Sequence, residues 1–315
     1  MKETVSLIIP TYNEKENITP LIERIGKALE GYSYEIVIVD DNSKDGTIET
    51  AEALCSRYPV RLLVRKNEKG LSTAVIHGIK NTKSPVICVM DADLQHPPEK
   101  LPEMIKAIEN GADIAFASRL VPGGGCAGWT FTRKAISAGA IKICHVLLPS
   151  SRRVKDITSG FFIFRRDKVN LDKLKPVGYK IGLETLCVGD FSNVTEVPFI
   201  FDDRTAGQSK LKIKTQVDYL KHIFSLMFRT GEVWRLAKFI GVGLSGVLVN
   251  MGVLALVENT TDWNPYVTLI PGIEVSIITN FILNDFFTFA DRRRGKTFSF
   301  FGRLVKYNVI ALAGA

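Results

Sequence analysis

The sequence predicts an α/β domain with a mostly parallel sheet, followed by an α-helical transmembrane domain. Short apolar segments alternate with segments of helical periodicity through residues 1–118, which is typical of a parallel sheet covered by helices on both faces. Residues 239–257 then form a stretch of 19 residues without a charge, long enough to cross a bilayer. The formal net charge of +8 fits either nucleic-acid binding or a membrane protein with basic flanks.

The elements of the α/β part follow from the residue pattern in chain order. Short apolar runs predict strands at residues 5–10, 35–39, 60–64, 86–90 and 114–118. Apolar residues at helical spacing predict helices at residues 17–29, 48–55, 71–80 and 101–109. Polar clusters follow four of the strands, at residues 11–14, 40–43 and 91–95 and at Arg119. Because ligands of parallel sheets bind beyond the carboxyl ends of the strands, we expect these clusters to converge on one site.

Two carboxylates, Asp91 and Asp93, directly follow a predicted buried strand. Carboxylates at this spacing can meet around one hard cation, and Mg²⁺ or Mn²⁺ shared with a diphosphate is the physical expectation. Gln95 could add an amide oxygen. Asp-x-Asp pairs are also common in solvated turns, so the interpretation depends on the preceding strand and on the neighbouring polar clusters. Asp41 ends another strand and suits recognition of a nucleobase or ribose, or else caps a turn or helix.

The carboxyl-terminal part is predicted to lie in a membrane. The expected domains are a globular domain over residues 1–211, an amphipathic interfacial helix over 212–229 and a transmembrane domain over 230–315, with helices at about 236–257 and 265–290 and a third that begins near 303 and is cut off by the end of the chain. Residues 211–238 and 281–315 each carry a net charge of +4, and residues 239–280 carry −3. Basic flanks stay in the cytosol, so the globular domain is expected there as well.

Two further stretches, residues 215–229 and 133–148, have apolar residues on one helical face and fit helices that lie on a membrane surface. Ordinary amphipathic core helices are the alternative. The five cysteines are widely spaced without a C-x-x-C pair, which disfavours a zinc site or a disulfide framework. Residues 1–210 carry no basic stripe interleaved with aromatic residues, which disfavours a nucleic-acid partner.

Three motifs together resemble the inverting glycosyltransferases of family two, whose catalytic domain has the GT-A fold of nucleotide-diphospho-sugar transferases. They are residues 8–14 (IIPTYNE), 39–47 (VDDNSKDGT) and 90–97 (MDADLQHP). Further motifs narrow the resemblance to the dolichol (polyprenol) phosphate mannose synthases: Gly128-Trp129, 133–137 (RKAIS), 156–162 (DITSGFF), 178–181 (GYKI) and 204–210 (RTAGQSK). The stretch 280–289 (NFILNDFFTF) is similar to the GtrA-like membrane domain.

The resemblance implies a reaction and a set of site residues. The family transfers mannose from GDP-mannose to the phosphate of a dolichol or polyprenol carrier, which gives dolichyl β-D-mannosyl phosphate with inversion at the sugar. The implied metal ligands for Mg²⁺ or Mn²⁺ are Asp91, Asp93 and Gln95. The implied nucleotide-binding residues are Pro10, Tyr12, Glu14, Val39, Asp41, Asp91, Arg204 and Lys210. The implied acceptor phosphate ligands are Arg119, Arg133 and Ser137, which with Asp93 form the catalytic set.

Acid–base chemistry explains why a reaction with a phosphate acceptor requires no general base. An alcohol acceptor needs a general base to remove its proton, whereas a phosphate acceptor is already an anion near neutral pH and needs cations that hold it. Surface salt bridges are the alternative interpretation of Arg119, Arg133, Arg204 and Lys210. Two other functions remain open: a polyprenyl-phosphate glucosyltransferase that uses UDP-glucose, and a lipid-linked sugar flippase whose soluble domain is regulatory. We expect a multi-pass membrane protein that contacts membrane lipid, and no obligatory protein partner is evident.

Overall fold

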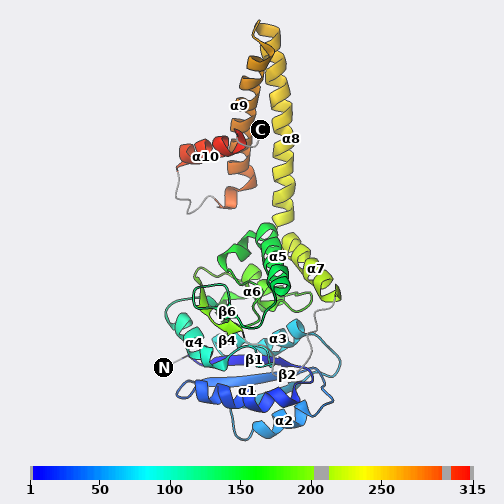
Figure 1. Ribbon diagram of the computed structural model, residues 1–315, viewed down its shortest axis with the longest axis vertical. Helices are drawn as coiled ribbons and strands as arrows, with labels where there is room; N and C mark the ends of the chain where they lie inside the picture. The colour runs from blue at the N-terminus through cyan, green and yellow to red at the C-terminus, as the bar shows by residue number, and fades with distance from the viewer. Residues whose placement is uncertain (1–2, 202–212, 293–298, 313–315) are drawn as a thin grey trace. The chain divides into compact units, whose positions relative to one another are not determined.

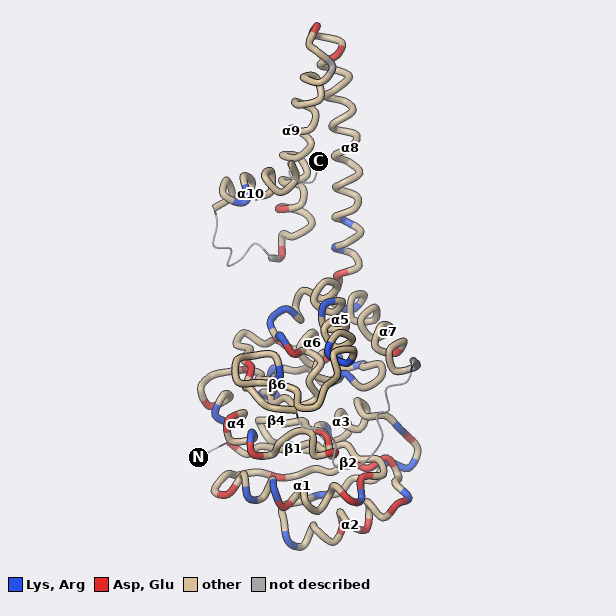
Figure 2. Tube along the Cα trace, viewed as in Figure 1, with Lys and Arg blue, Asp and Glu red and all other residues tan. Residues whose placement is uncertain are grey.

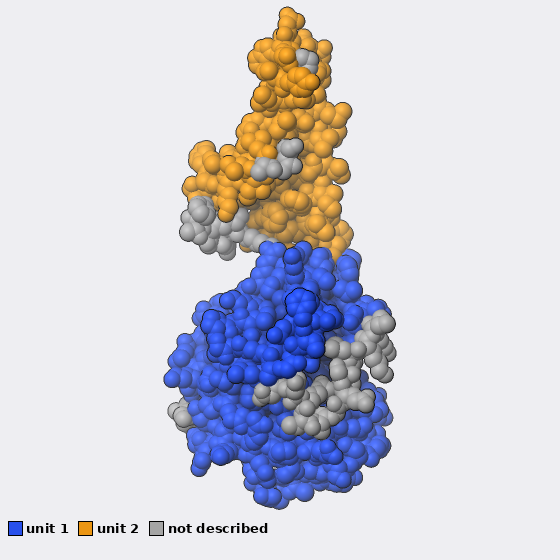
Figure 3. Space-filling model, viewed as in Figure 1, with its two compact units in different colours: residues 1–230 blue, residues 231–315 orange. Residues whose placement is uncertain are grey.

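The computed structural model describes residues 3–201, 213–292 and 299–312. The chain divides into two compact units, residues 1–230 and 231–315 (Figure 3). The first unit is an α/β domain and the second is helical.

A seven-stranded sheet in the order β3-β2-β1-β4-β7-β5-β8 forms the centre of the first unit (Figure 1). The strands are β1 Val5–Thr11, β2 Tyr34–Asp40, β3 Val60–Val64, β4 Val86–Val89, β5 Ile114–Ser118, β7 Phe162–Arg165 and β8 Val194–Pro198. All five predicted strands are confirmed. The sheet is parallel except at β7, which runs antiparallel to both β4 and β5. A second, two-stranded sheet pairs β6 Gly125–Cys126 with β9 Ile200–Phe201.

Helices cover both faces of the large sheet, as the sequence predicts (Figure 1). On one face lie α1 Lys15–Ala28, α2 Thr47–Leu54 and α4 Leu101–Glu109, and on the other lie α3 Leu71–Lys80 and α6 Ile181–Val188. Alternate strand residues divide accordingly, since Leu7 and Ile9 belong to the core on the α1 side while Ile8 faces α3. A Cβ on Gly78 of α3 would lie 2.6 Å from Ile8 Cγ2, so glycine permits this close helix–sheet approach.

Two amphipathic helices complete the unit, α5 Phe131–Leu147 and α7 Ile213–Arg229, and both have exposed apolar side chains. On α5 the exposed apolar residues are Phe131, Ile136, Ile143 and Val146. On α7 they are Val217, Leu220, Phe224 and Phe228. The opposite face of α7 is buried and includes Met227. Both helices are therefore apolar on the packed face and on the exposed face.

Short 3₁₀ segments connect the larger elements. They are Pro98–Lys100, Pro149–Arg153, Arg166–Lys168, Leu171–Lys173 and Ala290–Arg292.

The second unit contains α8 Glu232–Thr260, α9 Pro265–Leu283, a π-helical turn Asn284–Thr288 and α10 Phe300–Leu312. Among the described residues, two helices, Glu232–Thr260 and Tyr266–Thr288, are long and apolar enough to cross a membrane. Figure 2 shows how few charged residues lie along them. Small residues allow the helices to approach closely: a Cβ on Gly246 would lie 2.3 Å from Asn280 Nδ2, and one on Gly272 would lie 2.3 Å from Asn250 Oδ1.

Candidate functional site

One part of the candidate site lies at the carboxyl ends of β1 and β2. Pro10 and Val39 are register partners on these strands. The two strand ends are tied together by backbone N–H of Asn13, which donates to Ser43 Oγ at 2.8 Å. Val39 is fully buried, with its side chain toward Gly78 of α3, so any contact from Val39 to a ligand must use its backbone.

Two adjacent carboxylates, Asp40 and Asp41, lie at the end of β2, and each is hydrogen-bonded within the fold. Asp40 accepts hydrogen bonds from Thr11 Oγ1 at 2.8 Å and from the Ser43 backbone N–H at 2.7 Å. Asp41 is 6% exposed; its Oδ1 accepts from Arg65 Nε at 2.7 Å and its Oδ2 from the Gly70 N–H at 2.7 Å. Asp40 therefore stabilises the turn, and Asp41 holds the chain that follows β3. The role of Asp41 in base recognition stays a prediction.

Tyr12 and Glu14 lie on the segment between β1 and α1. The Tyr12 ring is exposed, and Lys69 Nζ lies 4.9 Å from its centroid. Glu14 accepts a hydrogen bond from Asn17 Nδ2 at 2.7 Å. An exposed aromatic ring beside a lysine at the end of a parallel sheet is suited to a nucleotide, because the ring can stack on a base and the lysine can approach a phosphate.

Asp91, Asp93 and Gln95 follow β4, where the chain turns sharply. Leu94 has a left-handed backbone with φ of 61°, and the Gln95 N–H donates to Asp93 Oδ1 at 3.2 Å. The Asp91 side chain is 35% exposed. A Cβ on Gly160 would lie 2.9 Å from Asp91 Oδ2, so the glycine leaves room beside this carboxylate.

His96 supports the Asp91 backbone from the protein interior. Its Nδ1 accepts a hydrogen bond from the Asp91 N–H at 3.1 Å, which places the ring proton on Nε2. The imidazole packs against Phe161 and Phe199. Burial lowers the pKa of His96 to about 4, so the ring is neutral at physiological pH and acts as a hydrogen-bond acceptor.

The carboxylates and the amide of this turn are oxygen donors, the ligand type that Mg²⁺ and Mn²⁺ prefer. No group of three or more His, Cys, Asp and Glu able to hold a metal occurs within the described part of the chain. A diphosphate could supply further oxygen ligands to a metal at Asp91 and Asp93. The space that Gly160 leaves beside Asp91 Oδ2 fits this arrangement.

The antiparallel strand β7 brings a second chain segment to the same edge of the sheet. Phe162, at its start, is paired with Val89 near the end of β4 and with Phe116 of β5. The residues just before β7 therefore lie at the carboxyl ends of β4 and β5. This placement explains why Gly160 meets Asp91 and why Asp156 meets Arg119.

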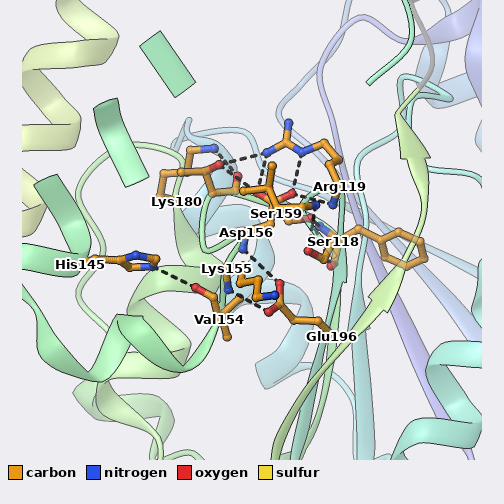
Figure 4. Close-up of polar contacts among 12 residues, drawn as sticks. Ser118, Arg119, His145, Val154, Lys155, Asp156, Ser159, Lys180 and Glu196 are labelled. Atoms are coloured by element: carbon orange, nitrogen blue, oxygen red, sulfur yellow. Dashed lines mark hydrogen bonds and ion pairs between the residues drawn. The ribbon is translucent and has the colours of Figure 1, made fainter. Parts of the chain in front are cut away.

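Arg119, at the end of β5, forms a buried bidentate ion pair with Asp156 (Figure 4). Arg119 Nε and Nη2 donate to the two carboxylate oxygens, each at 2.6 Å, and the Arg119 backbone N–H donates to Oδ2 at 3.0 Å. The exposed fractions of the two side chains are 9% and 0%. Burial opposes ionisation of Asp156, but the Arg119 guanidinium outweighs burial and holds the pKa of Asp156 below its usual value.

Trp129 brings Arg119 and Arg133 to one aromatic surface. The guanidinium carbons lie 5.0 Å and 4.2 Å from the Trp129 ring centroid, within the range of cation–π attraction. Arg133 and Ser137 occupy positions i and i+4 of α5, so they share one helix face. Of the three predicted phosphate ligands, the structure thus joins Arg119 and Arg133 through Trp129, and Ser137 lies one turn beyond Arg133.

The segment that carries Asp156 is held by side chains from several elements (Figure 4). Glu196 of β8 accepts from the backbone N–H groups of Lys155 and Asp156 at 2.8 Å and 3.1 Å. His145 Nε2 of α5 bonds to the Val154 carbonyl at 3.0 Å. From the start of α6, Lys180 Nζ donates to the Thr158 carbonyl at 2.5 Å.

The motifs that contain Asp156, Trp129 and Lys180 do not by themselves predict a role for these three residues. Their contacts with Arg119 or with the 156–159 segment depend on tertiary placement. Polar residues next to glycine in the DITSG motif were the available signal. The predicted ligands Arg204 and Lys210 lie outside the described residues.

Two protein families match the two parts of the chain. Residues 6–171 match the family model described as "Glycosyl transferase family 2". Residues 238–315 match the model described as "GtrA/DPMS, transmembrane domain".

Curated relatives match along most of the chain. A dolichol-phosphate mannosyltransferase from Pyrococcus furiosus is 52% identical over 311 residues, which cover 99% of this chain and 87% of that protein. A dolichol-phosphate mannosyltransferase from Saccharomyces cerevisiae is 37% identical over 240 residues, which cover 72% of this chain and 88% of that protein.

Solved structures share the fold. Glucosyl-3-phosphoglycerate synthase from Mycobacterium tuberculosis, in complex with Mn²⁺, UDP and glucosyl-3-phosphoglycerate, matches with a TM-score of 0.56 at 18% identity, covering 73% of this chain and 80% of that chain. The same enzyme with Mg²⁺ and UDP matches with a TM-score of 0.55 at 17% identity, covering 73% of this chain and 80% of that chain. The predicted GT-A-like domain followed by transmembrane helices is confirmed.

Proposed function

Because the chain belongs to glycosyl transferase family 2, we propose that it is a dolichol-phosphate mannosyltransferase, which transfers mannose to the phosphate of a dolichol or polyprenol carrier. The observation that carries the proposal is the 52% identity over 99% of the chain to a relative of that name. The match includes both the α/β domain and the membrane domain, so it concerns the whole architecture. We propose GDP-mannose as the donor and dolichyl β-D-mannosyl phosphate as the product.

On the donor side, the strand-end residues form the proposed nucleotide pocket. Pro10 lies near the end of β1 and is paired with Val39 of β2. Tyr12 and Glu14 follow β1, and Asp41 follows β2. Arg204 and Lys210 are proposed to bind the diphosphate as further cations.

Metal binding belongs to the turn after β4. Asp91, Asp93 and Gln95 would hold Mg²⁺ or Mn²⁺, which when bound neutralises charge on the diphosphate. His96 keeps the Asp91 backbone in place through the bond to its N–H. Gly160 keeps the space beside the Asp91 carboxylate open.

On the acceptor side, Arg119, Arg133 and Ser137 are proposed to hold the lipid phosphate. Asp156 orients the guanidinium of Arg119 by binding Nε and Nη2, which leaves Nη1 for an anion. The bound phosphate oxygen attacks C1 of mannose while the diphosphate leaves from the opposite side, so the configuration changes from α to β. No proton has to be removed from the attacking oxygen, so the reaction requires binding and orientation of two anions and no general base.

Membrane association would bring the acceptor within reach of this site. The exposed apolar faces of α5 and α7 are suited to the membrane–water boundary, and α8 and α9 are suited to span the bilayer. By the positive-inside rule, we propose that the basic flanks keep the α/β domain on the cytosolic side. A lipid carrier held in the membrane would thus present its phosphate to helix α5, which carries Arg133 and Ser137.

The experiment is a donor comparison with the purified full-length protein. Incubation with a short polyprenyl phosphate and Mn²⁺ should give mannosyl lipid from GDP-mannose and little product from UDP-glucose. Transfer of glucose alone would identify a polyprenyl-phosphate glucosyltransferase. Absence of any glycolipid product would favour a lipid-linked sugar flippase.

A further inference from the structure

Lys180 is a half-buried cation that is not among the proposed ligands of either substrate. It immediately precedes α6, and its Nζ donates to the Thr158 carbonyl at 2.5 Å. Within the residues that the structure describes, no carboxylate forms an ion pair with it. An ammonium that is partly removed from water without an ion-pair partner is stabilised when a ligand supplies the negative charge.

Lys180 and Arg119 bind the same residue. Arg119 Nη2 donates to the Thr158 hydroxyl at 3.0 Å, whereas Lys180 Nζ donates to the Thr158 carbonyl at 2.5 Å. Figure 4 shows both cationic groups on the same side of the segment that carries Asp156. The two cations are therefore held next to each other at one point of the site.

The local charge suits a phosphate monoester. Arg119, Arg133 and Lys180 are cations, and Asp156 is the carboxylate paired with one of them. Two net positive charges remain, and a phosphate monoester carries about −1.5 to −2 at neutral pH. The separate carboxylates Asp91 and Asp93 instead suit a cation.

The position of Lys180 is fixed from behind by the next turn of α6. Glu184 is fully buried and bonds to His222 Nε2 and Arg229 Nη1 of α7, each at 2.8 Å. The Lys175 N–H also donates to Glu184 Oε1 at 2.7 Å. A cation at the end of a helix anchored in this way loses little further freedom when it binds an anion.

We propose that Lys180 is a ligand of the acceptor phosphate and binds it together with Arg119. The proposal rests on the proposed mannosyl transfer to a lipid phosphate. It assigns Lys180 to the acceptor because it shares Thr158 with Arg119 and because Asp156 holds the same segment. Phosphate binding by Lys180 and Arg119 also reduces the repulsion between the two anionic substrates.

The test compares Lys180→Met, Lys180→Gln and Lys180→Arg in the full-length protein with GDP-mannose and a short polyprenyl phosphate. Loss of one charge-assisted bond predicts an increase of about 10- to 100-fold in the acceptor KM for Lys180→Met. The donor KM should change by less than about twofold. Lys180 is proposed to bind only the acceptor, and loss of binding to one substrate raises the KM of that substrate. Lys180→Arg, which keeps the charge, should recover most of the acceptor affinity.

The matched control is Lys175→Met, which removes an exposed lysine from the same chain segment and should leave both KM values unchanged. Lys180→Gln keeps a hydrogen-bond donor for the Thr158 carbonyl. A raised acceptor KM in this variant would therefore result from loss of the charge and not from disturbance of the loop. Unchanged acceptor KM in Lys180→Met and Lys180→Gln, or an effect confined to the donor KM, would overturn the assignment. If the wild-type protein transfers no mannose, the proposed function fails as well. If the wild-type protein transfers mannose and Lys180→Met has the same acceptor KM, only the role of Lys180 is refuted.

Discussion

Arg119 and Asp156 lie 37 residues apart in the chain, yet their side chains form two hydrogen bonds of 2.6 Å in the interior of the site. The pair leaves the guanidinium in one orientation, with Nε and Nη2 turned toward the carboxylate. The proposed acceptor site therefore depends on a residue that would not itself touch the acceptor.

Asp156→Asn should weaken both the fold and acceptor binding. Loss of one partner of a buried ion pair costs about 3–5 kcal/mol, because the remaining charge is left uncompensated. The free energy of unfolding of the α/β domain should fall by about that amount in urea titrations, and the acceptor KM should rise by more than about tenfold. Asp172→Asn, at a side chain that is 89% exposed, is the control and should change neither quantity. Equal acceptor KM values for Asp156→Asn and wild type would show that Arg119 is not oriented by this pair.

Asp93→Ala should strongly reduce metal-dependent transfer. Removal of an electrostatic contribution to the leaving group predicts a loss of about 10²- to 10³-fold in kcat. Chelation of the wild-type protein with EDTA should have the same effect, and Mn²⁺ or Mg²⁺ should restore activity to the wild type only. Mn²⁺ binding followed by electron paramagnetic resonance provides a second readout, which should show weaker binding in the variant. Intact product formation by Asp93→Ala would remove this residue from the metal site.

Gly160→Ala should weaken the metal site without a change at any ligand. The new Cβ would lie 2.9 Å from Asp91 Oδ2 and 3.3 Å from His96 Cε1, so the carboxylate must move. Displacement of a supporting contact typically costs 10- to 100-fold in metal affinity, and we expect about tenfold in Mn²⁺ titrations of activity. Gly139→Ala in α5, where nothing lies within 4 Å of the new Cβ, is the control. Normal Mn²⁺ affinity in Gly160→Ala would mean that Asp91 does not bind the metal in the orientation seen here.

Acceptor use should decline at alkaline pH because Lys180 loses its proton. Burial, together with the charge of Arg119, lowers the pKa of Lys180 from 10.5 to about 8, although Asp91 and Asp156 oppose the shift. Lysine is cationic below its pKa, so kcat/KM for the polyprenyl phosphate should be constant below pH 8 and fall as the pH rises through that value. The measurement is a profile of kcat/KM with Mg²⁺ at saturating GDP-mannose. Lys180→Arg should lack the alkaline decline, since arginine stays protonated; an identical decline in that variant would assign it to another group.

The exposed apolar face of α7 should matter only for acceptors in a bilayer. Phe224 and Phe228 are 52% and 60% exposed, so their replacement by serine should leave the thermal midpoint of the α/β domain nearly unchanged. Transfer to a long-chain polyprenyl phosphate in vesicles should fall several-fold because less apolar surface enters the membrane, whereas transfer to a short acceptor in detergent should stay constant. Gln216→Ser, at an exposed polar position of the same helix, is the control. A parallel loss with both acceptors would indicate that these residues support the fold and not membrane contact.

Strands and helices of the α/β domain could be predicted where their buried positions give a clear pattern of apolar residues. The core strands β1 and β2 are nearly continuous apolar runs, and the helix Leu71–Lys80 has the predicted bounds. The antiparallel strand β7 could not be predicted, because its direction depends on the neighbours it meets between β4 and β5. The buried stretch Phe162–Arg165 contains three apolar residues, which indicate a strand but not its orientation.

The site shows the same division between local and tertiary information. The location of Asp91, Asp93 and Arg119 at this edge of the sheet could be predicted because each directly follows an apolar strand. Their roles stay predictions. The bonds of Asp41 to Arg65 and of Arg119 to Asp156 join residues far apart in the chain, so no local pattern predicts them. Sequence motifs indicate which segments contribute to the candidate site, and the fold determines which side chains contact each other there.

The most direct test of the account follows the oxygen atoms of the acceptor. Polyprenyl phosphate labelled with ¹⁸O at its three non-bridging positions is incubated with GDP-mannose, Mn²⁺ and the purified full-length protein, and both products are analysed by mass spectrometry and NMR. Direct attack of the phosphate oxygen on C1 predicts a β-linked mannosyl lipid that retains all of the label and a GDP that contains none. A product without mannose, an α-linked product, or loss of label from the lipid phosphate would contradict the proposed transfer.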